Sequence, residues 1–112
     1  MQDDTATPLQ QLQQIETAVR SILMAILDED LPAAGRRAVR EIRQTMVQAR
    51  KALRDYEREE DARLQASLLP ESITGLEQVR HNILDASQYD VFSAIDVAHV
   101  TATIDQLIDR LR

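Results

Sequence analysis

Apolar residues recur every three or four positions along four stretches of this chain, which is the spacing of one face of an α-helix. The first stretch covers residues 8–27 and follows Thr7, a residue type that caps helix starts, while Pro8 suits the first helical turn. The pattern therefore predicts a first helix over 8–27. Its apolar face consists of Leu9, Leu12, Ile15, Val19, Ile22, Leu23, Ile26 and Leu27.

The second stretch is the longest and is predicted to be helical over 32–64. Residues 57–63 contain almost nothing apolar, so this end of the helix is expected to protrude, to break or to pack on a second subunit. The pattern leaves open whether residues 57–66 are helical. The apolar face of the stretch is formed by Ala38, Val39, Ile42, Met46, Ala49, Leu53 and Tyr56.

A boundary over 67–71, with Pro70 near its end, separates this helix from a third one. The third helix is predicted over 71–87. Gly75 weakens it slightly, because glycine is a poor helix former. Its apolar face consists of Ile73, Leu76, Val79, Ile83 and Leu84.

The fourth stretch has the most regular apolar seam and predicts a helix over 93–111. Its apolar positions share about 100° of arc at nearly heptad spacing. Ser93 and Asp96 resemble a capping box in which aspartate replaces the usual glutamate. The seam consists of Val97, Val100, Ile104, Leu107, Ile108 and Leu111.

Together these stretches predict an all-α fold, an antiparallel up-down four-helix bundle with a long second helix. Two glycines, three prolines and 3% aromatic residues argue against a sheet, and 112 residues suit a single domain. We place this domain at 7–112, after a disordered N-terminus at 1–6. The alternative is an extended hairpin that completes its core by dimerisation. The side chains expected to be buried are Ile15, Val19, Ile22, Ile26, Ile42, Met46, Leu53, Leu76, Val79, Ile83, Val100, Ile104 and Leu107.

Composition excludes several kinds of chemistry. The chain has no cysteine, which rules out disulfides, thiolate metal sites and cysteine nucleophiles and favours the cytoplasm. The N-terminus is acidic where a signal peptide would be basic, and the most apolar run, 22–27, is too short to span a membrane. We therefore expect a cytoplasmic protein without a membrane partner. Because no catalytic constellation stands out, we expect no enzymatic activity.

A line of cations, hereafter the basic stripe, follows one side of the second helix in an otherwise acidic protein. Segment 36–58 carries eight cations and three acids, net +5, whereas the remaining residues carry net −11. The stripe covers an arc of about 100° centred about 140° from the apolar face, so it is expected to point away from the core. Its members are Arg36, Arg40, Arg43, Arg50, Lys51, Arg54 and Arg58.

The basic stripe has three interpretations. It could dock an acidic protein partner, or a second subunit of a homodimer, because arginine binds carboxylates well. It could instead bind the phosphates of a nucleic acid, although no aromatic residue lies on it for base stacking. The structural alternative is a solvated face whose cations pair with acids of neighbouring helices. We take the first as the predicted function, a non-catalytic interaction module such as an adaptor, a regulatory subunit or a chaperone-like protein.

The two histidines offer weaker signals. Glu77, His81 and Asp85 are spaced four apart, and such a ladder is able to chelate a divalent metal, but surface ion pairing explains it equally. Asp96 and His99 form one Asp-x-x-His step, whereas a di-metal site in a bundle needs two such steps facing inward. We therefore predict no cofactor and no metal site, and metal binding through the ladder is the third candidate function.

Overall fold

The computed structural model describes residues 7–27, 32–89 and 94–112. This part of the chain contains four α-helices and no strand, which confirms the predicted all-α fold. The predicted disorder of residues 1–6 and the predicted cap at Ser93 lie outside the described residues. The helices are α1 (Pro8–Leu27), α2 (Ala33–Arg58), α3 (Ala62–Ala86) and α4 (Ala94–Leu111), and a short 3-10 turn, η1, covers Ser87–Tyr89.

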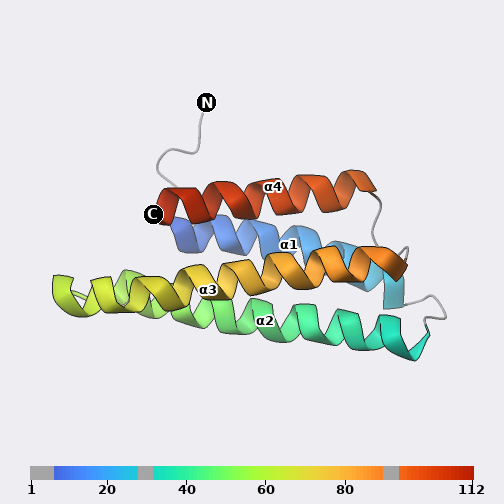
Figure 1. Cartoon of the computed structure of the whole chain (residues 1–112), viewed down its shortest axis with the longest axis horizontal. Helices are drawn as coiled ribbons and strands as arrows, with labels where there is room; N and C mark the ends of the chain where they lie inside the picture. Colours follow the sequence, from blue (N-terminus) through green and yellow to red (C-terminus); the bar gives the residue numbers. More distant parts are fainter. Residues whose placement is uncertain (1–6, 28–31, 90–93) are drawn as a thin grey trace.

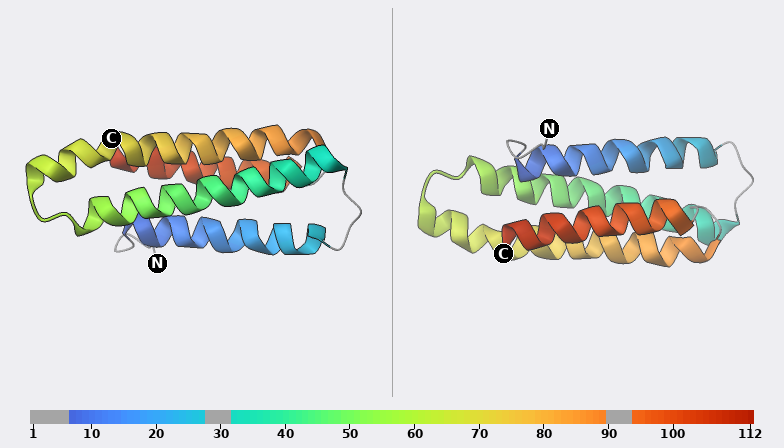
Figure 2. Two further views of the ribbon diagram at one scale, coloured as in Figure 1. Left: turned by 90° about the horizontal axis from the view of Figure 1, so that it is seen from below. Right: turned by 90° about the horizontal axis from the view of Figure 1, so that it is seen from above.

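The helices pack as a bundle in which each one contacts two principal neighbours. α1 packs on α2 and α4, and α3 also packs on α2 and α4. α2 and α3 lie side by side. At the end of the bundle where the chain passes from α2 to α3, these two helices extend beyond α1 and α4 (Figures 1 and 2). α2 is therefore covered by α3 on one side and by α1 on the other.

The boundary between α2 and α3 differs from the sequence prediction. α2 ends at Arg58 rather than at 64, and α3 begins at Ala62 rather than at 71. The Oδ1 atom of Asp61 accepts hydrogen bonds from the backbone N–H groups of Arg63, at 2.9 Å, and Leu64, at 3.5 Å. An aspartate in this position stabilises a helix start. The acidic residues 59–61 therefore connect α2 to α3, and the last of them, Asp61, caps α3.

Pro70 lies inside α3 and does not mark its start. A proline within a helix removes one backbone hydrogen bond, here the bond to the carbonyl of Ala66. Both residues are exposed, so solvent can bind this carbonyl instead. The longer helix extends the contact with the core, since Leu69, which precedes the predicted helix start, is partly buried against the core.

The start of α1 is capped as predicted and is also held by α2. The Oγ1 atom of Thr7 accepts the backbone N–H of Gln10 at 3.1 Å, which confirms Thr7 as the cap. The Oε1 atom of Gln10 accepts the N–H of Thr7 at 2.9 Å and completes a capping box. From α2, the Oε2 atom of Glu57 accepts the N–H of Leu9 at 2.6 Å. A carboxylate is favourable at a helix N-terminus, so this bond ties the beginning of α1 to the end of α2.

The core is built from apolar side chains of all four helices. Eleven of the thirteen side chains predicted to be buried are buried; Ile22 is only partly buried, and the side chain of Ile26 lies outside the described part of the chain. All six positions of the predicted α4 seam are buried, so that seam is confirmed. The largest fully buried side chains include Leu12, Ile42, Leu53, Leu76, Ile83, Ile104 and Leu107.

α2 and α3 approach each other closely where Gly75 meets Ala49. A Cβ atom added to Gly75 would lie 3.2 Å from the Cα atom of Ala49 and 3.4 Å from its Cβ atom. The glycine that weakens an isolated helix therefore allows a tight contact between two helices. Along the same interface, the Asn82 amide donates to Thr45 Oγ1 at 3.1 Å and to the carbonyl oxygen of Glu41 at 3.4 Å.

Leu107→Ala is expected to lower the free energy of unfolding by about 2–5 kcal/mol, because it removes a fully buried side chain from the α4 seam. Urea denaturation followed by circular dichroism measures this change. Leu64→Ala is the control, since Leu64 is exposed and its truncation should cost less than about 0.5 kcal/mol. A Leu107→Ala variant as stable as the wild type would show that the seam does not support the fold.

Gly75→Leu is expected to destabilise the protein by about 1–3 kcal/mol, because the new side chain must enter space next to the α2 backbone. This loss exceeds the gain in helix propensity, which is below about 1 kcal/mol. Thr74→Leu is the matched control, because it places the same side chain at the adjacent, exposed position. Equal urea midpoints for the two variants would contradict the role assigned to the close contact.

Candidate functional site

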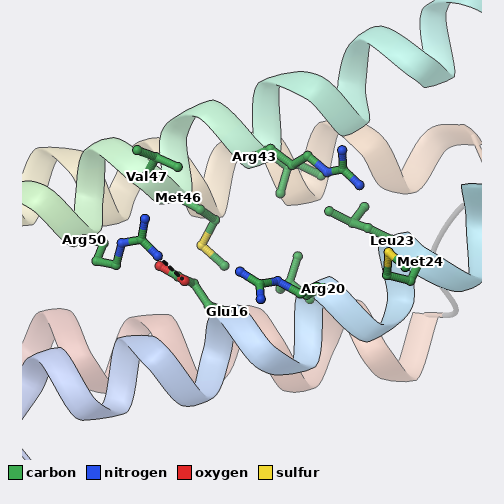
Figure 3. Close-up of a pocket in the computed structure, with 10 residues that line it drawn as sticks. Glu16, Arg20, Leu23, Met24, Arg43, Met46, Val47 and Arg50 are labelled. Carbon is green, nitrogen blue, oxygen red and sulfur yellow. Dashed lines mark hydrogen bonds and ion pairs between the residues drawn. The ribbon is translucent and has the colours of Figure 1, made fainter.

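The basic stripe lies along the side of α2 that adjoins α1. Arg50 and Arg54 are half-buried, so the expectation that the whole stripe points away from the core is wrong for these two residues. Arg43 and Arg50 line a groove shared with α1 (Figure 3). The exposed members of the stripe are Arg36, Arg40, Arg43, Lys51 and Arg58.

Among the described residues, one cation of the stripe forms an ion pair. The Nη1 atom of Arg50 lies 3.1 Å from the Oε2 atom of Glu16 on α1, and the two side chains are 38% and 13% exposed. The other six cations have no acidic group within 4.0 Å in this part of the chain. The Nε atom of Arg54 is buried and has no hydrogen-bond partner there. Within the described residues, the interpretation of the stripe as a face neutralised by neighbouring acids therefore holds for Arg50 alone.

A groove of about 330 Å³, hereafter the α1–α2 groove, lies beside this ion pair (Figure 3). Its lining includes buried apolar side chains from both helices. It also includes Met24 and Val47, which are apolar and yet 58% and 53% exposed. The lining residues are Glu16, Val19, Arg20, Leu23, Met24, Ile42, Arg43, Met46, Val47 and Arg50.

The groove carries a net positive charge. Three guanidinium groups, from Arg20, Arg43 and Arg50, stand against the single carboxylate of Glu16, which gives +2. Arg20 and Arg43 come from opposite helices and form no ion pair within the described residues. The Oε2 atom of Glu16 is bound to Arg50, while its Oε1 atom is buried without a hydrogen-bond partner there. The charge available to a ligand is therefore mainly that of Arg20 and Arg43.

The helices α1 and α2 diverge along the bundle from the end where α1 begins, as Figure 2 shows. On the side of α2 that faces α3, the Asn82 amide donates hydrogen bonds to Thr45 Oγ1 and to the Glu41 carbonyl oxygen. These bonds attach α2 to α3. On the α1 side, Arg20 and Arg43 extend from opposite helices, and neither forms an ion pair within the described residues. Met24 and Val47, which line the groove from opposite helices, remain exposed.

Two members of the predicted stripe, Arg43 and Arg50, line this groove, whereas the sequence pattern did not reveal its α1 wall. Arg20 reads as an isolated charge, and Met24 falls outside the predicted apolar face of the first helix. A signal is nevertheless present, because Glu16, Arg20 and Met24 are spaced four apart and share one line along α1. The pattern does not say which neighbouring helix lies beside that line, and this is why it does not reveal the groove.

The histidine ladder stays apart from the groove. Glu77, His81 and Asp85 are exposed on α3, and His99 is exposed on α4. Within residues 7–27, 32–89 and 94–112, no group of three metal-ligating side chains is placed to hold an ion. The apolar and guanidinium groups of the α1–α2 groove are suited to binding a ligand that is both apolar and anionic.

Comparisons of this chain with protein-family models, curated proteins and solved structures found no match. None of the helices in the described part of the chain is long and apolar enough to cross a membrane. The case for a function therefore depends on the geometry and charge of the surface formed by α1 and α2.

Arg50→Gln is expected to destabilise the protein more than Glu16→Gln does. The first change leaves a carboxylate that is 13% exposed without its cation, which costs about 1–3 kcal/mol. The second leaves a guanidinium that is 38% exposed and can reach solvent, at a cost of at most about 1 kcal/mol. Urea denaturation of both variants measures the difference, and the reverse order would contradict the burial assigned to Glu16.

Proposed function

We propose that this protein is a non-catalytic helical interaction module, such as an adaptor, a regulatory subunit or a chaperone-like protein, whose basic stripe docks an acidic protein partner. The observation that carries the proposal is a set of cations on one side of α2, six of which have no ion pair within the described residues. They occur in a chain whose remaining residues carry net −11.

An energetic argument supports a partner for these cations. Like charges three or four positions apart on a helix cost about 0.2–0.5 kcal/mol per pair. Arg36 and Arg40 form such a pair, as do Arg40 and Arg43. Carboxylates of a bound protein would reverse this cost, and arginine forms two parallel hydrogen bonds to a carboxylate. Met24 and Val47 are exposed apolar side chains beside the stripe, and they would add apolar contacts with a bound protein.

The proposal takes the bundle to be an antiparallel up-down bundle, which the course of the chain through Figure 1 supports. It also places the protein in the cytoplasm. Because the chain has no cysteine, it forms no disulfide and does not depend on an oxidising compartment. The alternative partner is a second subunit that would complete a homodimer. Light scattering coupled to size exclusion, at low and high salt, distinguishes a monomer of 12.7 kDa from that dimer.

Poly-L-glutamate serves as a probe of the acidic-partner function. The combined variant Arg36→Gln, Arg40→Gln and Arg43→Gln is expected to weaken its binding at least about tenfold, because it removes three exposed cations of the stripe. Arg50 is left unchanged because it pairs with Glu16. Fluorescence anisotropy with labelled poly-L-glutamate measures the affinity.

The control for this experiment removes the same charge elsewhere. Its three changes, at cations that are also exposed, are Arg63→Gln, Arg110→Gln and Arg112→Gln. We expect the control to retain wild-type affinity, and circular dichroism should show that both variants keep their helix content. An equal loss in the two variants would mean that overall charge, and not the stripe, governs binding, and would sink the proposal.

Double-stranded DNA tests the nucleic-acid alternative, which the unpaired line of cations along α2 also fits. If about five phosphates were bound, the logarithm of the affinity would fall with the logarithm of salt concentration with a slope near −4 to −5. We expect no such binding from a chain with net charge −6. DNA binding with that slope, together with no binding of poly-L-glutamate, would replace the acidic-protein function by the nucleic-acid one.

A further inference from the structure

We propose that the α1–α2 groove receives the apolar face of an acidic amphipathic helix from a partner protein, with Arg20 and Arg43 binding carboxylates that flank this face. The inference rests on the proposed function and adds the structural class of the partner and its anchoring residues. Its basis is that one groove combines exposed apolar side chains with two cations that have no ion pair in the described part of the chain.

The groove has the length of a short helical contact. Its α1 wall extends from Glu16 to Met24, and its α2 wall extends from Ile42 to Arg50. Each wall covers eight residue steps, or about 12 Å at 1.5 Å per residue. Side chains at i, i+4 and i+7 of a docked helix span about 10 Å, so three anchors on one helical face fit this length.

The apolar part of the groove is adaptable. Of the three methionines in the chain, Met24 and Met46 both line it. Methionine is flexible and polarisable, and it is frequent on surfaces that bind apolar anchors of varied shape. Because Met24 and Val47 are exposed, a docked helix would remove apolar surface from water on both walls.

The charge of the groove selects an acidic helix. Arg50 is already bound to Glu16, whereas Arg20 and Arg43 extend from opposite walls (Figure 3). A helix lying between the walls can present one carboxylate to each of these guanidinium groups. A basic helix would meet both groups with like charge, so the groove discriminates between the two.

A second copy of the chain fits this groove less well than an acidic helix does. A two-fold contact centred on the groove would bring the net positive charge of the groove in one copy against that of the other. A contact between the groove and a different surface of the second copy would be heterologous. Such a contact does not form a symmetric dimer about a two-fold axis. The geometry therefore favours a different protein as the occupant.

The test uses three labelled peptides of about 18 residues, which is long enough to form a helix on binding. The first has leucines at i, i+4 and i+7 and glutamates on the flanks. The second is a scrambled peptide of the same composition, and the third carries lysine in place of each glutamate of the first. Fluorescence anisotropy measures the binding of each peptide to the full chain.

Met24→Gln combined with Val47→Gln removes the exposed apolar groups of the groove without changing its charge. The matched control combines Leu64→Gln with Leu84→Gln, which alters two apolar side chains outside the groove that are 52% and 40% exposed. We expect the first peptide to bind the wild type and the control at least about tenfold more tightly than the groove variant. It should also bind the wild type at least about tenfold more tightly than either other peptide does.

Several results would overturn the inference. Suppose that the ordered and scrambled acidic peptides bind equally and that the groove variant binds them as the wild type does. The groove would then not be the binding site, but the acidic-partner function would still be supported by charge alone. Preferential binding of the lysine peptide would overturn both. If no peptide bound at about 1 mM, the inference would fail, while the poly-L-glutamate experiment would decide the function separately. A wild-type dimer that the groove variant loses in light scattering would assign the groove to a second copy.

Discussion

The packing of α2 on α3 is the constraint on which the rest of the structure depends. Gly75 lets the backbone of α3 approach Ala49, and Asn82 adds hydrogen bonds to the same side of α2. Because this side of α2 is committed to α3, α1 packs on the other side, next to the basic stripe. α4 then completes the bundle by packing on both α1 and α3.

This arrangement leaves incomplete packing where the charges are. α1 is joined to α2 by the hydrogen bond from Leu9 to Glu57 and by the Arg50–Glu16 ion pair. Beyond that pair, at the level of Arg43, no ion pair between the two helices is found in the described residues. Closing the gap would remove guanidinium groups from water without a compensating partner, which is unfavourable. The exposed apolar side chains of the α1–α2 groove, Met24 and Val47, lie in the same part of the surface as these cations.

Prediction from the sequence succeeded where one apolar face repeats along a whole helix. The predicted bounds of 8–27 match α1, and those of the last helix differ from α4 by one residue at the start. Prediction failed between α2 and α3, because Pro70 pointed to the wrong position for the helix start. Pro70 is tolerated inside α3, where its exposed position lets solvent bind the unpaired carbonyl, whereas Asp61 provides the cap that starts the helix.

The sequence by itself determined the number of helices in the described chain, most of their buried faces and the line of cations on α2. These properties follow from the geometry of a single helix, in which residues three and four apart share a face. Only the tertiary structure decided that Glu16, Arg20 and Met24 lie opposite the basic stripe and form a groove with it. The position of one helix beside another depends on close contacts such as that of Gly75 with Ala49, and the periodicity of either helix alone does not contain this information.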